Sequence, residues 1–166
     1  MAHIKLGEDN VTTAGELPEI GSQAPDFKVT LTDLTDTTLS DFSGKNIILN
    51  IFPSIATGVC SASVRKFNEL AAGKENTVVI CVSRDLPFAH KSFCEAEGIE
   101  NVVPTSEYKN NGFSDNYLVK QLNGKFEGLL SRCIVVIDPA GKVTYTEQVP
   151  QIGQEPDYDK ALAAVS

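Results

Sequence analysis

The stretch Pro53-Ser54-Ile55-Ala56-Thr57-Gly58-Val59-Cys60 joins a segment with the pattern of a strand to a segment with the pattern of a helix. The apolar run before it, residues 47–52, has the length and composition of a buried strand. After it, in residues 61–71, apolar side chains recur at helical spacing. We therefore expect Cys60 at a junction between strand and helix, in the first turn of the helix.

A cysteine at that place has a physical reason to ionise. The first turn of a helix has free N–H groups and the positive end of the helix dipole, so it favours an anion. Lowering the pKa of a thiol by about 2.5 units takes roughly 3.4 kcal/mol, whereas a helix end gives about 0.3–1 kcal/mol and at most about 2. A reactive Cys60 thus needs a second cation, either Arg65 one turn further along or a distant arginine. The alternative interpretation is a small, inert, buried thiol.

Composition narrows the possible functions. A chain of 166 residues is expected to form one domain, residues 1–166. The net charge of −8 argues against nucleic acid or an anionic membrane as a partner. Residues 1–10 lack the apolar core of a signal peptide, and no apolar run approaches transmembrane length, so we expect a cytoplasmic protein. Four cysteines in such a chain indicate thiol chemistry or burial rather than a disulfide framework.

The order of elements predicts an α/β fold. Apart from the strand and helix around Cys60, the expected elements are a hairpin (4–6 with 11–13), strands at 27–31, 77–83 and 102–105, helices at 85–97, 110–117 and 158–165, and a second hairpin (132–137 with 142–146). Residues 33–43 and 118–130 carry no firm pattern. A strand-helix-strand half followed by an antiparallel hairpin and a helix is typical of a thioredoxin-like fold, here with an N-terminal hairpin extension.

The segment around residues 85–98 carries a second cysteine. Asp85 is a plausible N-cap, with Pro87 in the first turn, and Gly98 is expected to end the helix. Cys94 and His90 stand four residues apart, but two ligands do not make a zinc site and no Cys-x-x-Cys occurs. We therefore expect no metal and a solvated His90.

The sequence resembles a known family at these positions. Pro53, Thr57 and Cys60 fit Pro-x-x-x-Thr-x-x-Cys, the active-site pattern of the peroxiredoxins. The wider run of residues 50–68 closely resembles the bacterial thiol peroxidases, the atypical two-cysteine branch of that family. The resemblance extends from the N-terminal hairpin to residues 155–158, which is nearly the whole chain.

The resemblance implies roles for five residues. Cys60 would be the peroxidatic cysteine, and Cys94 matches the resolving cysteine. Thiol peroxidases place an arginine at the start of a strand against the peroxidatic thiolate, and Arg132 matches it; this would be the second cation. Thr57, through its hydroxyl, and Arg132 would donate hydrogen bonds to the peroxide oxygens, and Pro53 would shape the loop and shield the sulfur from water.

The other two cysteines are expected to be packing residues. Cys81 lies inside the apolar run of residues 77–83, which is typical of a strand covered on both faces. Strand alternation places Arg132 and Cys133 on opposite faces, so Cys133 would point away from Cys60 if Arg132 points toward it.

The activity that the resemblance implies is that of an antioxidant oxidoreductase, a thioredoxin-dependent peroxidase without cofactor or metal. Cys60 would reduce hydrogen peroxide and alkyl hydroperoxides and become a sulfenic acid, which would condense with Cys94 of the same chain. Thioredoxin would reduce the disulfide, and the subunits would pair as a homodimer. Since a disulfide needs Cα atoms within about 7 Å, a helical Cys94 is not expected to reach Cys60 unless both segments rearrange.

One departure from the family and two alternatives bear on this interpretation. Thiol peroxidases usually carry aspartate where this chain has Ala56, which removes a hydrogen-bond acceptor from the loop but changes no proton or electron in the reaction. A dithiol oxidoreductase would need Cys-x-x-Cys, whereas Ser61-Ala62-Ser63 follows Cys60. A non-catalytic peroxide sensor that uses the same Cys60 and Cys94 is an alternative that the sequence leaves open.

Overall fold

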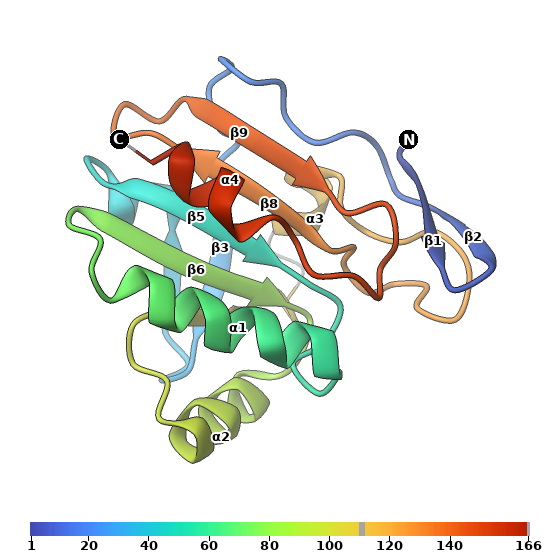
Figure 1. Ribbon diagram of the computed structural model, residues 1–166, viewed down its shortest axis with the longest axis horizontal. Helices are drawn as coiled ribbons and strands as arrows, with labels where there is room; N and C mark the ends of the chain where they lie inside the picture. The colour runs from blue at the N-terminus through green and yellow to red at the C-terminus, as the bar shows by residue number, and fades with distance from the viewer. Residues whose placement is uncertain (110–111, 166) are drawn as a thin grey trace.

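The computed structural model describes residues 1–109 and 112–165. Within them, two strands form a separate hairpin and seven form one mixed sheet in the order β4-β3-β7-β6-β5-β8-β9 (Figure 1). The strands are β1 (His3–Leu6), β2 (Asp9–Thr12), β3 (Lys28–Leu31), β4 (Asp36–Thr38), β5 (Asn46–Ile51), β6 (Thr77–Ser83), β7 (Val103–Ser106), β8 (Cys133–Ile137) and β9 (Val143–Gln148). The helices are η1 (Leu39–Phe42, a 3₁₀ helix), α1 (Gly58–Ala71), α2 (Pro87–Glu97), α3 (Phe113–Tyr117) and α4 (Tyr158–Ala163).

Strand β5 lies in the interior of the sheet. It pairs in parallel with β6 and antiparallel with β8. All of its residues are buried because the sheet is covered on both faces, which is why the strand reads as an almost continuous apolar run. The predicted strand-helix-strand half, whose strands β5 and β6 pair in parallel, and the predicted β8–β9 hairpin are both present.

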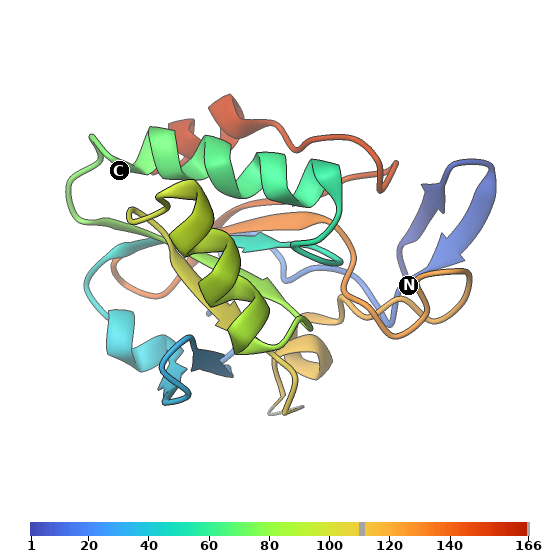
Figure 2. The same cartoon turned by 90° about the horizontal axis from the view of Figure 1, so that it is seen from below.

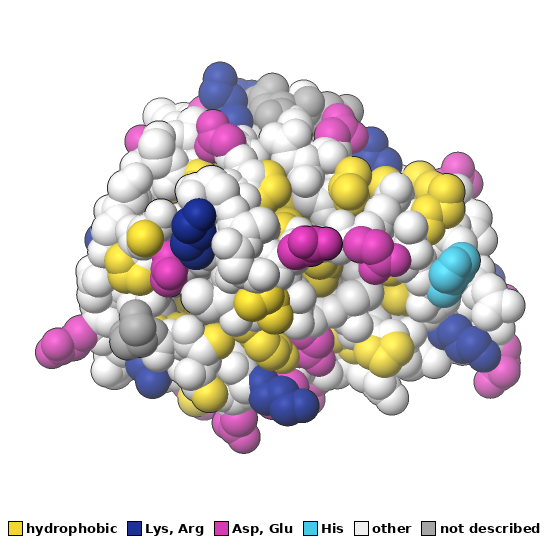
Figure 3. Space-filling model, turned by 90° about the horizontal axis from the view of Figure 1, so that it is seen from above, with side chains coloured by type: hydrophobic (Ala, Val, Ile, Leu, Met, Phe, Trp, Pro, Cys, Tyr) yellow, Lys and Arg dark blue, Asp and Glu magenta, His cyan; other side chains and the backbone are white. Residues whose placement is uncertain are grey.

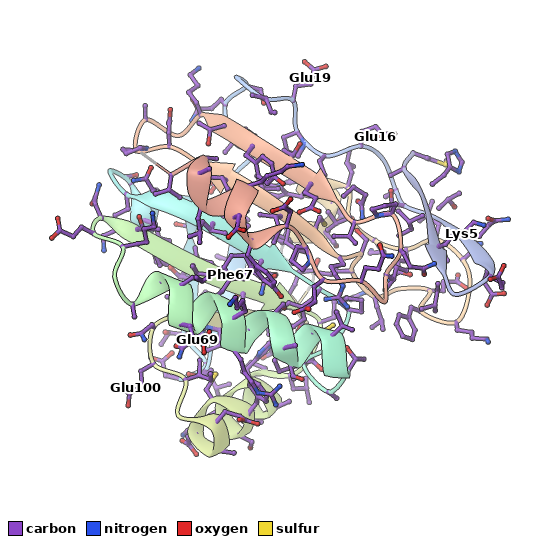
Figure 4. The ribbon with its side chains drawn as sticks, in the orientation of Figure 1. Lys5, Glu16, Glu19, Phe67, Glu69 and Glu100 are labelled. Atoms are coloured by element: carbon purple, nitrogen blue, oxygen red, sulfur yellow. The ribbon has the colours of Figure 1, made fainter. Side chains whose placement is uncertain are left out.

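The two faces of β5 enter different hydrophobic cores. Ile47, Leu49 and Ile51 pack on the face covered by α3, whereas Ile48 packs on the face of α1 and α4. Figure 2 shows α1 and α4 on one side of the sheet and α3 on the other. Phe67 of α1 lies between its helix and the sheet (Figure 4), edge-on to the ring of Tyr158 at 5.1 Å. These contacts fix the direction in which α1 leaves the end of β5.

Helix α2 departs from its sequence prediction at two residues. Gly98 ends the helix in the left-handed region, as predicted. The N-cap, however, is Leu86, so the prediction for Asp85 was wrong. His90 is 1% exposed, so the expectation of a solvated histidine was wrong as well. Both side chains take part in one polar cluster that is described below.

The remaining differences are small. Residues 33–43 form β4 and η1, which the pattern did not predict because a three-residue polar strand has no apolar alternation. The predicted helix at 110–117 is present as α3, and its first two positions lie outside the described residues. No helix in the described part of the chain is long and apolar enough to cross a membrane. On the face shown in Figure 3, Lys and Arg side chains are scattered among acidic and apolar ones.

Candidate active site

Cys60 lies where the sequence placed it, in the first turn of α1. The chain leaves β5, passes through residues 52–57, which we call the Cys60 loop, and enters α1 with Thr57 as its N-cap. The Cys60 side chain is fully buried. A helix N-terminus favours negative charge on such a group.

Arg132 provides the cation beside this sulfur. It stands immediately before β8 and is 2% exposed. Its Nη2 donates a hydrogen bond to the Sγ of Cys60 at 3.2 Å, and its Nε donates to the carbonyl of Ile152 at 2.7 Å. The bond to Ile152 fixes the direction of the guanidinium, which places a positive charge directly against the Cys60 sulfur.

One nitrogen of the same guanidinium has a free hydrogen-bond donor. Nη1 of Arg132 is buried and has no hydrogen-bond partner within the described residues. Buried donors in proteins are nearly always paired. An unpaired donor on a group that already touches the Cys60 sulfur is well placed to bind an oxygen of a molecule that reacts there.

Arg65, the nearer of the two arginines considered from the sequence, is engaged elsewhere. Its Nη2 forms an ion pair with Glu97 of α2 at 2.8 Å, and its guanidinium lies 5.5 Å from the centre of the Phe93 ring. Arg65 therefore links α1 to α2, and the distant Arg132 is the arginine that contacts Cys60.

The other two residues of the motif shape the Cys60 loop. Pro53 is buried. The Thr57 hydroxyl donates a hydrogen bond to the carbonyl of Ser54 at 3.0 Å, so the predicted donor role of Thr57 was wrong for this arrangement and its oxygen can only accept from a second partner. The turn is closed further by the Thr57 amide, which donates to the same carbonyl at 3.1 Å.

Sequence reasoning missed the residue that holds this loop. The carboxylate of Asp85 accepts hydrogen bonds from the Ser54 hydroxyl at 2.7 Å and from the Ile55 amide at 2.8 Å. A signal was available, because β5 and β6 are parallel neighbours and polar residues that follow such strands meet at one edge of the sheet. Ala56, which carries no acceptor of its own, is exposed between these anchored residues.

Cys94 lies on α2 and is not bonded to Cys60, since all four cysteines are free thiols. It is half-buried, and burial raises the pKa of its thiol. Cys81 and Cys133 are fully buried, and desolvation raises the pKa of each to about 12, so both are protonated and poor nucleophiles at neutral pH. Cys133 belongs to the core opposite that of Cys60, as strand alternation predicted.

The described residues contain no group of three or more His, Cys, Asp or Glu side chains that could hold a metal ion. Three residues lie together where β5 ends and β8 begins: Cys60, Arg132 and Thr57. A thiol with a cation at 3.2 Å and a neighbouring free donor is equipped to attack an electrophile and to stabilise charge that develops on it.

Comparison with known proteins points the same way. Residues 19–162 match the model of the Redoxin family. The chain is 48% identical to the thiol peroxidase of Corynebacterium glutamicum over 100% of both chains, and 52% identical to that of Mycobacterium tuberculosis over 99% of both. It superimposes on a peroxiredoxin-like protein from Aquifex aeolicus with a TM-score of 0.91 and 35% identity, covering 97% of this chain and 94% of the other. The predicted fold class and the resemblance inferred from residues 50–68 are both confirmed.

Proposed function

Because the chain belongs to the Redoxin family and is an oxidoreductase of the peroxiredoxin type, we propose that it reduces hydroperoxides at Cys60. The single observation that carries the proposal is the contact of 3.2 Å between Arg132 Nη2 and Cys60 Sγ in a fully buried setting. Burial of an arginine without a charged partner is costly, so packing alone does not explain an arginine at this place. A role in the chemistry of the neighbouring thiol does.

In the first step the Cys60 thiolate attacks the terminal oxygen of R–O–O–H. A sulfur–oxygen bond forms and the oxygen–oxygen bond breaks, so that sulfur loses two electrons and becomes a sulfenic acid. The bonding pair leaves with the RO group, which takes up a proton and departs as an alcohol, or as water when R is hydrogen. Charge therefore develops on the leaving oxygen during the attack.

The roles of the neighbours follow from their free groups. Arg132 Nη1 is an unpaired donor that can stabilise the charge on the peroxide oxygens. The Thr57 oxygen, whose own proton is donated to Ser54, can accept a hydrogen bond from the peroxide O–H and orient the substrate. The buried Pro53 keeps water from the sulfur.

In the second step the sulfenic acid of Cys60 condenses with the thiol of Cys94, which releases water and forms an intrachain disulfide. The two residues lie on different helices, and Cys60 is fully buried while Cys94 is half-buried. A bond between them requires Cα atoms within about 7 Å. We therefore infer that the first turn of α1 and the body of α2 move toward each other after oxidation.

The remaining parts of the proposal rest on the family alone. The reductant of the disulfide is thioredoxin, the substrates include alkyl hydroperoxides and hydrogen peroxide, and the enzyme is a homodimer in the cytoplasm. The whole chain, residues 1–166, acts as a single domain that needs no cofactor.

The direct test of this function is sustained turnover. The protein is mixed with cumene hydroperoxide, thioredoxin, thioredoxin reductase and NADPH, and NADPH oxidation is followed. We expect many equivalents of NADPH consumed per protein chain, whereas the sensor alternative predicts about one. The Cys94→Ser variant should still react once with peroxide, but its thioredoxin-linked turnover should fall by about tenfold or more because no disulfide forms. Unchanged steady turnover in that variant would contradict the role of Cys94.

A further inference from the structure

A partly buried polar cluster joins the Cys60 loop to the helix that carries Cys94. We call it the Asp85 cluster; its members are Ser54, Ser83, Asp85 and His90. Asp85 lies between the end of β6 and the start of α2, and its carboxylate accepts from Ser54 at 2.7 Å and from the hydroxyl of Ser83 at 2.5 Å. Its backbone carbonyl accepts from the hydroxyl of Ser106 on β7. The side chain of Asp85 thus reaches backward to the loop instead of capping α2.

The proton positions in the cluster are determined by its geometry. The single proton of the Ser83 hydroxyl goes to Asp85, and the Ser83 oxygen accepts from the Asp85 amide at 3.2 Å. The contact of 2.9 Å between that oxygen and Nε2 of His90 must therefore be donated by the histidine. Burial lowers the pKa of His90, and the nearby Asp85 carboxylate opposes this shift only in part, so the ring is neutral at pH 7.

His90 extends the cluster into α2. It is 1% exposed, and its ring lies edge-on to Phe52 in the Cys60 loop at 6.1 Å. A movement of α2 that carries His90 along with Cys94 would break its contacts with Ser83 and Phe52. The cluster therefore stabilises the arrangement in which the two cysteines are apart, while the same carboxylate fixes the loop that prepares Cys60 for attack.

We propose that Asp85 is a positioning residue that acts on both steps of the reaction in opposite directions. It accelerates the attack of Cys60 on the peroxide by holding the loop, and it slows disulfide formation by holding the start of α2. The inference rests on the proposed function and adds to it a residue that sets the balance between the two steps. A slower second step leaves the sulfenic acid exposed to further peroxide for longer, so Asp85 also influences how readily Cys60 is oxidised to sulfinic acid.

The test measures the two rates separately. The rate of peroxide reaction is taken from peroxide loss in a Cys94→Ser background, and the rate of disulfide formation from acid-quenched samples of the two-cysteine protein analysed by mass spectrometry. For Asp85→Ala we expect the first rate to fall by about tenfold or more, as two hydrogen bonds from the loop to a charged group are lost. The second rate should rise several-fold.

Two further variants test the same proposal with smaller changes to the cluster. In Asp85→Asn the amide oxygen can accept from Ile55 and Ser83 while its NH₂ donates to the Ser54 oxygen, so both rates should stay within about threefold of wild type. Ser54→Ala removes one tie from the loop with little change in volume, and both rates should shift in the same directions as in Asp85→Ala but less. If Asp85→Ala does not fold, these two variants decide the question.

The matched control is Asp138→Ala. Asp138 also holds a loop through two backbone amides, those of Ala140 and Lys142 at 2.9 Å each, but it lies in the β8–β9 turn at the other end of the sheet. The Asp138→Ala variant should lose stability without a change in the ratio between the rate of peroxide reaction and the rate of disulfide formation. The inference is overturned if both rates fall together in Asp85→Ala, or if the ratio changes equally in Asp138→Ala. Failure of wild-type Cys60 to react with peroxide at all would overturn the proposed function as well.

Discussion

Replacement of Cys60 by serine is expected to abolish peroxide reduction, with a loss of more than about a thousandfold in the rate of peroxide consumption. A serine hydroxyl is not ionised at neutral pH and is a much weaker nucleophile than a thiolate. Cys60 is fully buried, and serine is nearly isosteric with it, so the fold should persist. The measurement is the loss of cumene hydroperoxide in the presence of excess reductant.

The control for this variant is Cys133→Ala. Cys133 is as fully buried as Cys60, but it lies in the opposite core, and its thiol has a pKa raised to about 12 by burial. It should therefore contribute packing alone, and the control should keep near-normal activity. Peroxide consumption that survives in Cys60→Ser and disappears in Cys133→Ala would reverse the assignment.

Replacement of Arg132 by glutamine is expected to lower the rate of the first step by about 10²–10³-fold, the usual effect of removing a group that stabilises developing charge. The variant loses the cation 3.2 Å from Cys60 Sγ and the unpaired Nη1 donor together. Arg132→Lys keeps the charge, but a single ammonium cannot bind the Ile152 carbonyl and the sulfur in the same fork geometry. Its rate should be intermediate. Both rates are measured by peroxide competition under single-turnover conditions.

Arg65→Gln is the matched control for the arginine. It removes a guanidinium from α1 that pairs with Glu97 and has no contact with the sulfur. Its rate of peroxide reaction should stay close to that of the wild type. Thermal melts should accompany all three variants, because Arg132 is buried and its Nε bond to Ile152 contributes to folding. A first-step rate in a folded Arg132→Gln variant within a few-fold of wild type would rule out the charge-stabilising role.

Much of the fold could be read from the sequence because its central elements have strong local patterns. The buried β5 and β6 read as continuous apolar runs, and α1 shows a helical period directly after the loop, which placed Cys60 correctly. The partner of Cys60 could not be derived in this way. Arg132 lies 72 residues further along the chain, and periodicity gives only the face of its strand. Its direction toward Cys60 was expected from the family resemblance.

The errors at Asp85 and His90 have a common physical cause. Capping rules consider a side chain and its own helix, and by those rules Asp85 should cap α2. In the folded protein the loop amide of Ile55 and the hydroxyl of Ser54 compete for the same carboxylate, and these long-range partners win. His90 can be buried because its Nε2–H donates a hydrogen bond to the oxygen of Ser83, seven residues earlier in the chain. No local pattern carries either fact.

The central claim is that oxidation passes from Cys60 to Cys94 within one chain. The measurement that tests it most directly is peptide mapping after one equivalent of cumene hydroperoxide is added to the reduced protein, followed by acid quenching, denaturation and alkylation of the remaining thiols. We predict an intrachain Cys60–Cys94 disulfide, with Cys81 and Cys133 recovered as alkylated thiols. Formation of that bond would add a crosslink between α1 and α2 that this structure lacks, since all four cysteines are free thiols here. Oxidation at Cys81 or Cys133, or a Cys60 that remains reduced, would contradict the account.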